Sequence, residues 1–260
     1  MDNIRSYLNW AKGYYEINRE ERNLAAIFYH VLLLDDNLNS FLKTVSCDFL
    51  MKSEEVGIYF EYSYLRDLWF NIKGENKDRV KRDIIYRFLK PSNIDELEQM
   101  STYKFNSYFG AVPSASLEYI QSPGNWSIEK YRKNIKDNDE FLKVCKFKWA
   151  FNAKPDIVIH ASHDNAICIE CKLESGESTY PTKPFEIKEF QARNLNFVTQ
   201  TSLQKYIMED LLGIQTQFVF LVQKAESKSE THTILLWKDA FSNLNTNSCP
   251  FFIKEWIRRL

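Results

Sequence analysis

Two short apolar runs, separated by a polar turn, constrain the fold of this chain more than any other feature. The first run is Lys154-Pro155-Asp156-Ile157-Val158-Ile159, and the second is Ala166-Ile167-Cys168-Ile169-Glu170-Cys171-Lys172. Runs of this length, rich in β-branched residues and bounded by polar residues, predict β-strands. The polar link His163-Asp164-Asn165 predicts that the two strands form a hairpin.

The charged residues of this hairpin gather at one of its ends. Side chains alternate between faces at ~3.3 Å per residue, so Glu170 and Lys172 project from the same face about 7 Å apart. The hairpin also sets Asp156, at the start of the first strand, beside Glu170. Either these groups share a pocket that holds two carboxylates and an ammonium, or this is an ordinary hairpin with exposed charges at its ends.

The pattern Pro155-Asp156, thirteen intervening residues, then Glu170-Cys171-Lys172 resembles the PD-(D/E)XK nuclease superfamily. The resemblance covers roughly Val144 to Trp237. It implies a restriction-endonuclease-like core of helix, three strands, helix and further strand. It further implies that Asp156 and Glu170 hold Mg²⁺ or Mn²⁺ and that Lys172 assists the attacking water. Carboxylate oxygens are ligands that suit these cations better than zinc.

The fold expected from these patterns is mixed α/β, with a central mixed β-sheet flanked by helices and a largely helical N-terminal portion. We expect one nuclease domain over residues 1–260, in which 46–140 is a helical insertion and 141–240 is the catalytic core. Ser127 predicts the start of a helix over Ile128–Ile135, followed by a first core strand around Val144–Phe151.

A helix that precedes the strands supplies a third candidate metal ligand. Apolar residues of the segment Asn18–Leu34 follow helical spacing, which predicts an amphipathic helix with one buried stripe. Glu20 and Glu21 fall at opposite edges of that stripe. The superfamily usually adds an acidic residue from such a helix, and Glu21 is the preferred candidate here. The alternative is that both acids only favour the positive end of the helix dipole.

Another predicted helix, Gln200–Leu212, leads into an apolar strand over Gln217–Val222. Some branches of the superfamily place Gln and Tyr from this helix near the scissile phosphate, which makes Gln204 a candidate catalytic residue. Tyr206 follows Gln204 by only two residues, so the spaced Gln-x-x-x-Tyr pattern of certain exonuclease-like branches is absent here. We therefore expect an endonuclease. Beyond it, Thr231–Trp237 predicts a strand and Phe251–Arg259 an amphipathic helix.

A basic helix is the candidate nucleic-acid-binding surface. Lys73 to Lys90 carries seven basic and three acidic residues. Arg79, Lys81, Arg82 and Arg87 are its candidate phosphate contacts, in line with the use of Lys and Arg on nucleic-acid backbones. The alternative is an ordinary solvated helix face, because charge runs usually have no other role.

Composition narrows the remaining function classes. Hydrophobic residues make up 44% of the chain, which is typical of globular proteins, and no apolar run reaches the ~20 residues that span a bilayer. Met1–Arg5 shows no signal-peptide segment, so we expect a cytoplasmic protein without membrane contact. Five scattered cysteines do not form a disulfide framework, and the pair Cys168/Cys171 falls on opposite strand faces, which argues against zinc.

The function expected from the resemblance is Mg²⁺-dependent cleavage of DNA, by the effector subunit of a bacterial defence or restriction system. The alternative is a catalytically idle relative that binds nucleic acid or supports an assembly. A net charge of −1 gives no strong positive field for autonomous DNA binding. We therefore expect a protein partner, either a sensor, helicase or ATPase subunit, or a second copy of the chain.

Overall fold

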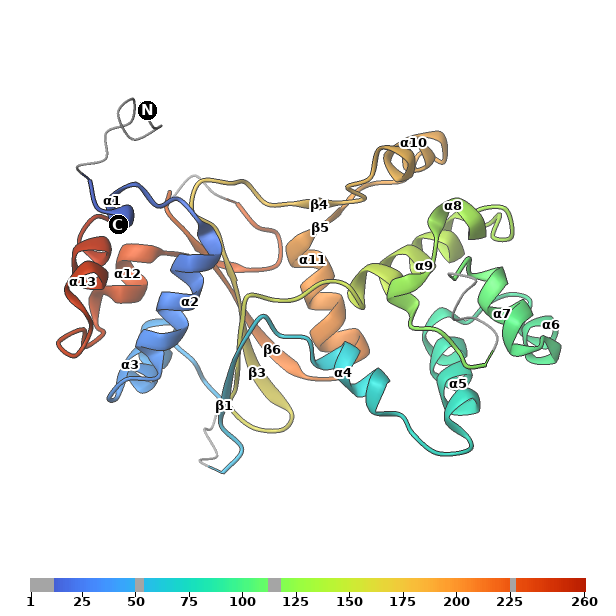
Figure 1. Cartoon of the computed structure of the whole chain (residues 1–260), viewed down its shortest axis with the longest axis horizontal. Helices are drawn as coiled ribbons and strands as arrows, with labels where there is room; N and C mark the ends of the chain where they lie inside the picture. Colours follow the sequence, from blue (N-terminus) through green and yellow to red (C-terminus); the bar gives the residue numbers. More distant parts are fainter. Residues whose placement is uncertain (1–11, 50–53, 112–117, 225–227) are drawn as a thin grey trace, which may run out of the picture. The chain divides into compact units, whose positions relative to one another are not determined.

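The computed structural model describes residues 12–49, 54–111, 118–224 and 228–260. It is a mixed α/β structure, as expected, with a five-stranded mixed sheet and a separate two-stranded sheet (Figure 1). The chain forms two compact units, which we call the sheet unit and the helical unit. The sheet unit comprises Met1–Glu61, Pro155–Gly176 and Gln215–Leu260, and the helical unit comprises Tyr62–Lys154 and Glu177–Ile214. The domain ranges expected from the sequence stay predictions.

The sheet unit contains the five-stranded sheet in the order β1-β2-β3-β6-β7. The first three strands pair antiparallel, and β3, β6 and β7 pair parallel. Their bounds are β1 Gly57–Phe60, β2 Ile157–His160, β3 Asn165–Cys171, β6 Gln215–Val222 and β7 Thr233–Leu236. Strands β2 and β3 form the predicted hairpin, and β3 is the central strand of the sheet.

Helices of the sheet unit cover one face of this sheet. They are α2 Glu21–Leu32, α3 Asn37–Thr44, α12 Trp237–Ser242 and α13 Phe251–Ile257, and the short helix α1 Tyr14–Ile17 contacts α13. Leu24 and Phe28 of α2 pack in one buried core with Ile167, Ile169 and Cys171 of β3. The apolar face of the hairpin therefore points to these helices, and Figure 1 shows α2 and α3 on the same side as α12 and α13. Glu170 projects from the other face of β3.

The helical unit consists mainly of short helices. They are α4 Tyr64–Asn71, α5 Lys77–Leu89, α6 Ile94–Gln99, α7 Thr102–Tyr108, α8 Ile128–Tyr131, α9 Asn138–Ala150, α10 Pro184–Ala192 and α11 Gln200–Lys205, with the 3₁₀ turn η3 Pro123–Asn125. Helix α11 continues directly into a π-helix, η4 Tyr206–Leu211. Strands β4 Thr179–Tyr180 and β5 Val198–Thr199 form its two-stranded sheet.

The strand expected around Val144–Phe151 is wrong, because helix α9 occupies Asn138–Ala150. The carboxylate of Asp137 accepts a hydrogen bond from the backbone N–H of Glu140 at 2.8 Å and so begins the helix. Phe141, Val144 and Cys145, at helical spacing, are all buried. A short run of aromatic and β-branched residues fits both kinds of element, and the helix start at Asp137 distinguishes them.

Four other predicted elements are confirmed, while the helix expected over Ile128–Ile135 is shorter and covers only α8, Ile128–Tyr131. Helix α2 lies within Asn18–Leu34, the helix over Gln200–Leu212 is α11 with η4, and the strands near Gln217–Val222 and Thr231–Trp237 are β6 and β7. Within the described residues, no helix combines the length and the apolar character needed to cross a bilayer. The expectation about a signal peptide concerns Met1–Arg5, which lie outside the described residues.

Candidate active site

Asp156 lies directly before β2, where the hairpin register brings it to the end of β3. Ile157 pairs with Ile169, so extending the antiparallel register by one residue sets Asp156 opposite Glu170. Its carboxylate oxygen Oδ2 accepts the backbone N–H of Cys171 at 2.8 Å. Its carbonyl accepts the backbone N–H of Glu61 at 2.8 Å. Asp156 is thus fixed from both neighbouring strands.

Glu170 and Lys172 form a buried ion pair at the end of β3. Glu170 is 0% exposed and Lys172 is 7% exposed. The ammonium nitrogen Nζ of Lys172 lies 2.7 Å from the Glu170 oxygen Oε1. Ionised groups are almost never buried to this extent unless they are paired. The alternative of an ordinary hairpin with exposed charges at its ends is therefore wrong.

Glu21 joins this group from the first turn of α2. Its oxygen Oε1 accepts a hydrogen bond from Lys172 Nζ at 3.1 Å. Its oxygen Oε2 accepts two more, from the backbone N–H of Leu173 at 3.0 Å and from the hydroxyl of Ser175 at 2.7 Å. Lys172 therefore lies between two carboxylates that are 149 positions apart in the sequence.

The main chain of Lys172 is held as closely as its side chain. Its N–H donates to the carbonyl of Leu221 on β6 at 2.8 Å. Its carbonyl accepts the indole N–H of Trp237 at 2.8 Å, and Trp237 itself is buried. Sequence reasoning missed Trp237 as part of the site. A tryptophan at the end of a predicted strand was the available signal, because a buried indole N–H needs an acceptor.

The charges of the group perturb one another. Burial lowers the pKa of Lys172, but the carboxylates of Glu170 and Glu21 outweigh it and hold that pKa above its ordinary value. Burial is the main cause that raises the pKa of Asp156. The N–H of Cys171 and the ammonium of Lys172 lower this pKa, the carboxylates of Glu21 and Glu61 raise it, and the net result is a pKa of about 6. Three carboxylates and one ammonium give the ionised group a net charge of −2.

We expect Asp156→Asn to stabilise the metal-free protein at pH 7.5 by about 1–3 kcal/mol. The folded pKa of about 6 exceeds the unfolded value of 3.8, so the folded state binds the proton more tightly. Stability is therefore lost as pH rises from about 4 to about 6, and the cost is complete above that range. Asparagine removes the titration and still offers an oxygen to the N–H of Cys171.

Urea denaturation of both proteins in EDTA at several pH values measures this difference. The variant should gain stability over wild type as pH rises, and the two should converge near pH 4. Asp164→Asn is the matched control, because Asp164 is exposed in the hairpin turn. A variant that is less stable than wild type at pH 7.5 contradicts the expectation.

The donor set suits a hard divalent cation. Mg²⁺ is commonly bound through one or two carboxylates, with water and substrate phosphates completing its shell. Asp156 and Glu170 are two such carboxylates, and the charge of the group matches one divalent ion in magnitude. Across the residues that the structure describes, no three His, Cys, Asp or Glu side chains lie close enough together to hold a metal by themselves. The fit is therefore to a site of two carboxylates rather than to a complete protein cage.

No family model, curated protein or solved structure matches this chain. What can be inferred about its chemistry rests on the residues of the site itself.

Gln204, the fourth candidate catalytic residue, lies on α11 in the helical unit and is buried there. The group around Lys172 belongs to the sheet unit. The catalytic role of Gln204 stays a prediction.

The four candidate phosphate contacts on α5 have different surroundings. Lys81 is buried with its ammonium 5.2 Å from the centre of the Trp69 ring, and burial lowers its pKa. Arg82 donates to the carbonyls of Leu97 and Met100 at 2.9 and 2.8 Å, which fixes the end of α6. Arg79 and Arg87 are exposed. These two arginines are therefore the ones whose charge faces solvent.

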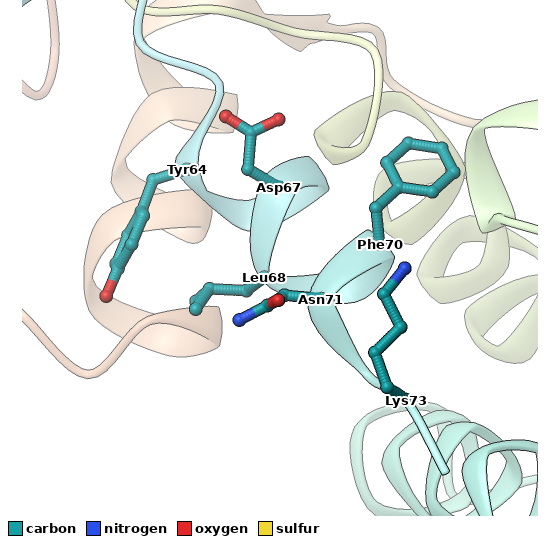
Figure 2. A pocket seen from close by; sticks show the side chains of 6 residues that line it. All are labelled: Tyr64, Asp67, Leu68, Phe70, Asn71 and Lys73. Atoms are coloured by element: carbon teal, nitrogen blue, oxygen red, sulfur yellow. The ribbon is translucent and has the colours of Figure 1, made fainter.

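A surface hollow of about 480 Å³ on the helical unit is formed by α4 and the residues after it (Figure 2). Figure 2 shows Tyr64 and Leu68 on one side of the helix and Phe70 on the other, with Lys73 beyond its end. The hollow includes none of the candidate catalytic, metal-binding or phosphate-binding residues.

Proposed function

We propose that this chain is a metal-dependent endonuclease that cleaves DNA, built on a restriction-endonuclease-like core. One observation carries the proposal: a buried Glu170–Lys172 pair converges with Asp156 and Glu21 at the end of one hairpin, with a net charge of −2. Burying such a group is costly, and perturbed ionisable groups gathered in this way are typical of functional sites.

The order of elements supports the same proposal. Helix α2, strands β1, β2 and β3, helix α11 and strand β6 follow one another in the order helix, three strands, helix and strand. This is the order that the PD-(D/E)XK resemblance implies, with β1 rather than Val144–Phe151 as the first strand. Helices α3 to α10, which include α5 and α9 with 13 residues each, and the strands β4 and β5 lie between these elements.

The residues of the site have distinct roles in this proposal. A bound Mg²⁺ or Mn²⁺, held by Asp156 and Glu170, would polarise a phosphate oxygen and activate water. Lys172 has a raised pKa and is an ammonium at neutral pH, so it acts by its charge and its N–H donors. It stabilises negative charge on the phosphate and orients the attacking water, and it does not act as a general base.

Incubation of the purified chain with supercoiled plasmid tests the proposal. We expect nicked and linear products with Mg²⁺ or Mn²⁺, no products in EDTA, and little loss with a zinc-selective chelator. The idle-subunit alternative predicts DNA binding without cleavage under every condition. Thermal unfolding adds a second measurement: Mg²⁺ should raise the melting temperature of wild type but not that of Asp156→Asn.

Exchange of Arg79 and Arg87 for Glu is expected to weaken DNA binding and to flatten its dependence on salt. Each lost phosphate contact removes about one unit of the slope of log K against log salt concentration. The slope is measured by fluorescence anisotropy at several salt concentrations. Lys188→Glu with Lys238→Glu changes the same charge at other exposed positions. If the two double variants give equal slopes of log K against log salt concentration, α5 makes no specific phosphate contacts and is an ordinary solvated helix face.

The proposal includes a protein partner for this enzyme. Phe251 and Phe252 on α13 are exposed, as is Tyr14 on α1. Phe252 and Tyr14 line an apolar pocket of about 590 Å³ in the sheet unit. Exposed apolar surface of this kind favours contact with another protein, either a sensor or motor subunit or a second copy. Light scattering on the purified chain distinguishes an oligomer from a monomer, and a plasmid cleavage assay on the same sample shows whether a monomer cleaves DNA without a partner.

A further inference from the structure

Every carboxylate oxygen of Glu21 is engaged by donors from one short segment, residues 172–175. Oε1 accepts the ammonium of Lys172, and Oε2 accepts the N–H of Leu173 and the hydroxyl of Ser175. All three donors follow the last residue of β3. Glu21 therefore fixes both the side chain of Lys172 and the direction in which the chain leaves the sheet.

The sequence left two roles open for Glu21, a metal ligand or a residue that favours the helix dipole, and neither fits this geometry well. A residue at the first turn that served only the helix dipole would face solvent, as the neighbouring exposed Glu20 does. A metal ligand needs an oxygen directed at the ion. Here both oxygens already accept hydrogen bonds from the protein, and within the described chain no three acidic, His or Cys side chains that include Glu21 are placed to hold a metal ion.

Lys172 has two carboxylate partners of different character. Glu170 is on the same strand, two residues away, and is fully buried. The Glu21 side chain is 28% exposed and comes from a helix instead. A lysine side chain has four rotatable bonds, so a single partner on its own strand leaves its ammonium several positions. A second acceptor from α2 restricts the ammonium to one of them.

We propose that Glu21 is a positioning residue for Lys172, which holds the ammonium in its catalytic place, and is not a metal ligand. The proposal rests on the proposed nuclease function for its consequence in catalysis. The positioning itself is a property of the folded chain and can be measured without any reaction.

Chemical labelling of lysines, read by mass spectrometry, tests the positioning directly. With an amine-reactive reagent in EDTA, Lys172 in Glu21→Gln should be labelled at least about tenfold faster than in wild type, since the variant loses a hydrogen bond between two charged groups, which is stronger than one between neutral groups. Glu20→Gln removes the same charge one residue earlier and should leave the rate unchanged. Lys148, equally buried in the helical unit, serves as an internal standard for intact folding.

Three outcomes of the labelling decide the matter. A faster rate at Lys172 with an unchanged rate at Lys148 supports the proposal. An unchanged rate at Lys172 overturns it. If Glu21→Gln raises both rates by unfolding, Glu21→Asp replaces it, because aspartate keeps the charge but is one methylene too short to reach Lys172, Leu173 and Ser175 together. For Glu21→Asp, too, a faster labelling rate at Lys172 with an unchanged rate at Lys148 supports the proposal, and an unchanged rate at Lys172 overturns it.

Kinetics test the consequence for catalysis. We expect Glu21→Gln to lower kcat by about 10–100-fold, because misplacement of a catalytic group by about 1 Å costs on this order. The KM for DNA and the Mg²⁺ concentration at half-maximal activity should change less than about threefold. A shift of the Mg²⁺ midpoint by more than tenfold would instead make Glu21 a ligand and overturn the proposal. If wild type cleaves no DNA, the proposed function fails, and the labelling result still decides whether Glu21 positions Lys172.

Discussion

Glu170→Gln is expected to reduce DNA cleavage by about 10²–10³-fold or more, while the protein stays folded. Loss of one electrostatic group from a preorganised site has effects of this size. Glutamine keeps the volume of Glu170 and still offers an oxygen to Lys172, 2.7 Å away in wild type. Plasmid cleavage under single-turnover conditions measures the loss, and circular dichroism checks the fold.

Glu174→Gln is the matched control for this experiment. Glu174 lies four residues further along the chain, and its side chain is 56% exposed in an ion pair with Arg19 at 3.5 Å. The control should cleave DNA within about twofold of wild type, since an exposed pair of this kind contributes little. Full activity in Glu170→Gln would end the assignment of this site.

Lys172→Met is expected to lower the free energy of unfolding by about 3–5 kcal/mol at pH 7.5. Methionine fills much of the same space but leaves Glu170, which is fully buried, without its nearest positive charge. Breaking a buried pair is costly because the remaining charge has lost its water as well as its partner. Urea denaturation at pH 7.5 measures the loss.

The double variant Lys172→Met/Glu170→Gln isolates the pair itself. Removing both charges should recover much of the stability that the single variant loses, and the double-mutant cycle then gives the coupling between the two residues. For comparison, Arg258→Met breaks an exposed ion pair with Glu255 and should change stability by less than about 1 kcal/mol. Equal losses in Lys172→Met and Arg258→Met would show that burial of the first pair has no energetic consequence.

Lys172 has two roles, one in the proposed reaction and one in the stability of the fold, and this affects how a substitution at Lys172 is interpreted. The resemblance to the PD-(D/E)XK superfamily implies only that Lys172 assists the attacking water. In the structure the same ammonium also neutralises Glu170 and Glu21. Loss of activity in Lys172→Ala can therefore arise from unfolding, and Glu170→Gln is the cleaner test of chemistry.

The hairpin and its charged end could be predicted because they depend on neighbouring residues. Alternation along β3 places Glu170 and Lys172 on one face, and the turn fixes which residue of β2 lies opposite. The same local rules failed at Val144–Phe151, where aromatic and β-branched residues fit a strand but the chain forms α9. They also gave no sign of β1, whose four residues pair with β2 about a hundred positions later.

The remaining contacts of the site are long-range, and no local pattern encodes them. Glu21 and Lys172 are 151 residues apart, and Trp237 follows Lys172 by 65. On α5, charge alone could not distinguish Arg79, which is exposed, from Arg82, which binds two carbonyls within the helical unit. Only packing shows which cations are already engaged.

The distance along the chain between the parts of the site has a consequence for synthesis of the protein. Lys172 needs Glu21 from α2, Leu221 from β6 and Trp237 from α12. At about 5–20 residues per second, tens of residues and several seconds separate the emergence of Lys172 from that of Trp237. A nascent or prematurely terminated chain thus carries the Asp, Glu and Lys of the motif without the contacts that set them in place. Translation itself therefore keeps the site unassembled until Trp237 has been made.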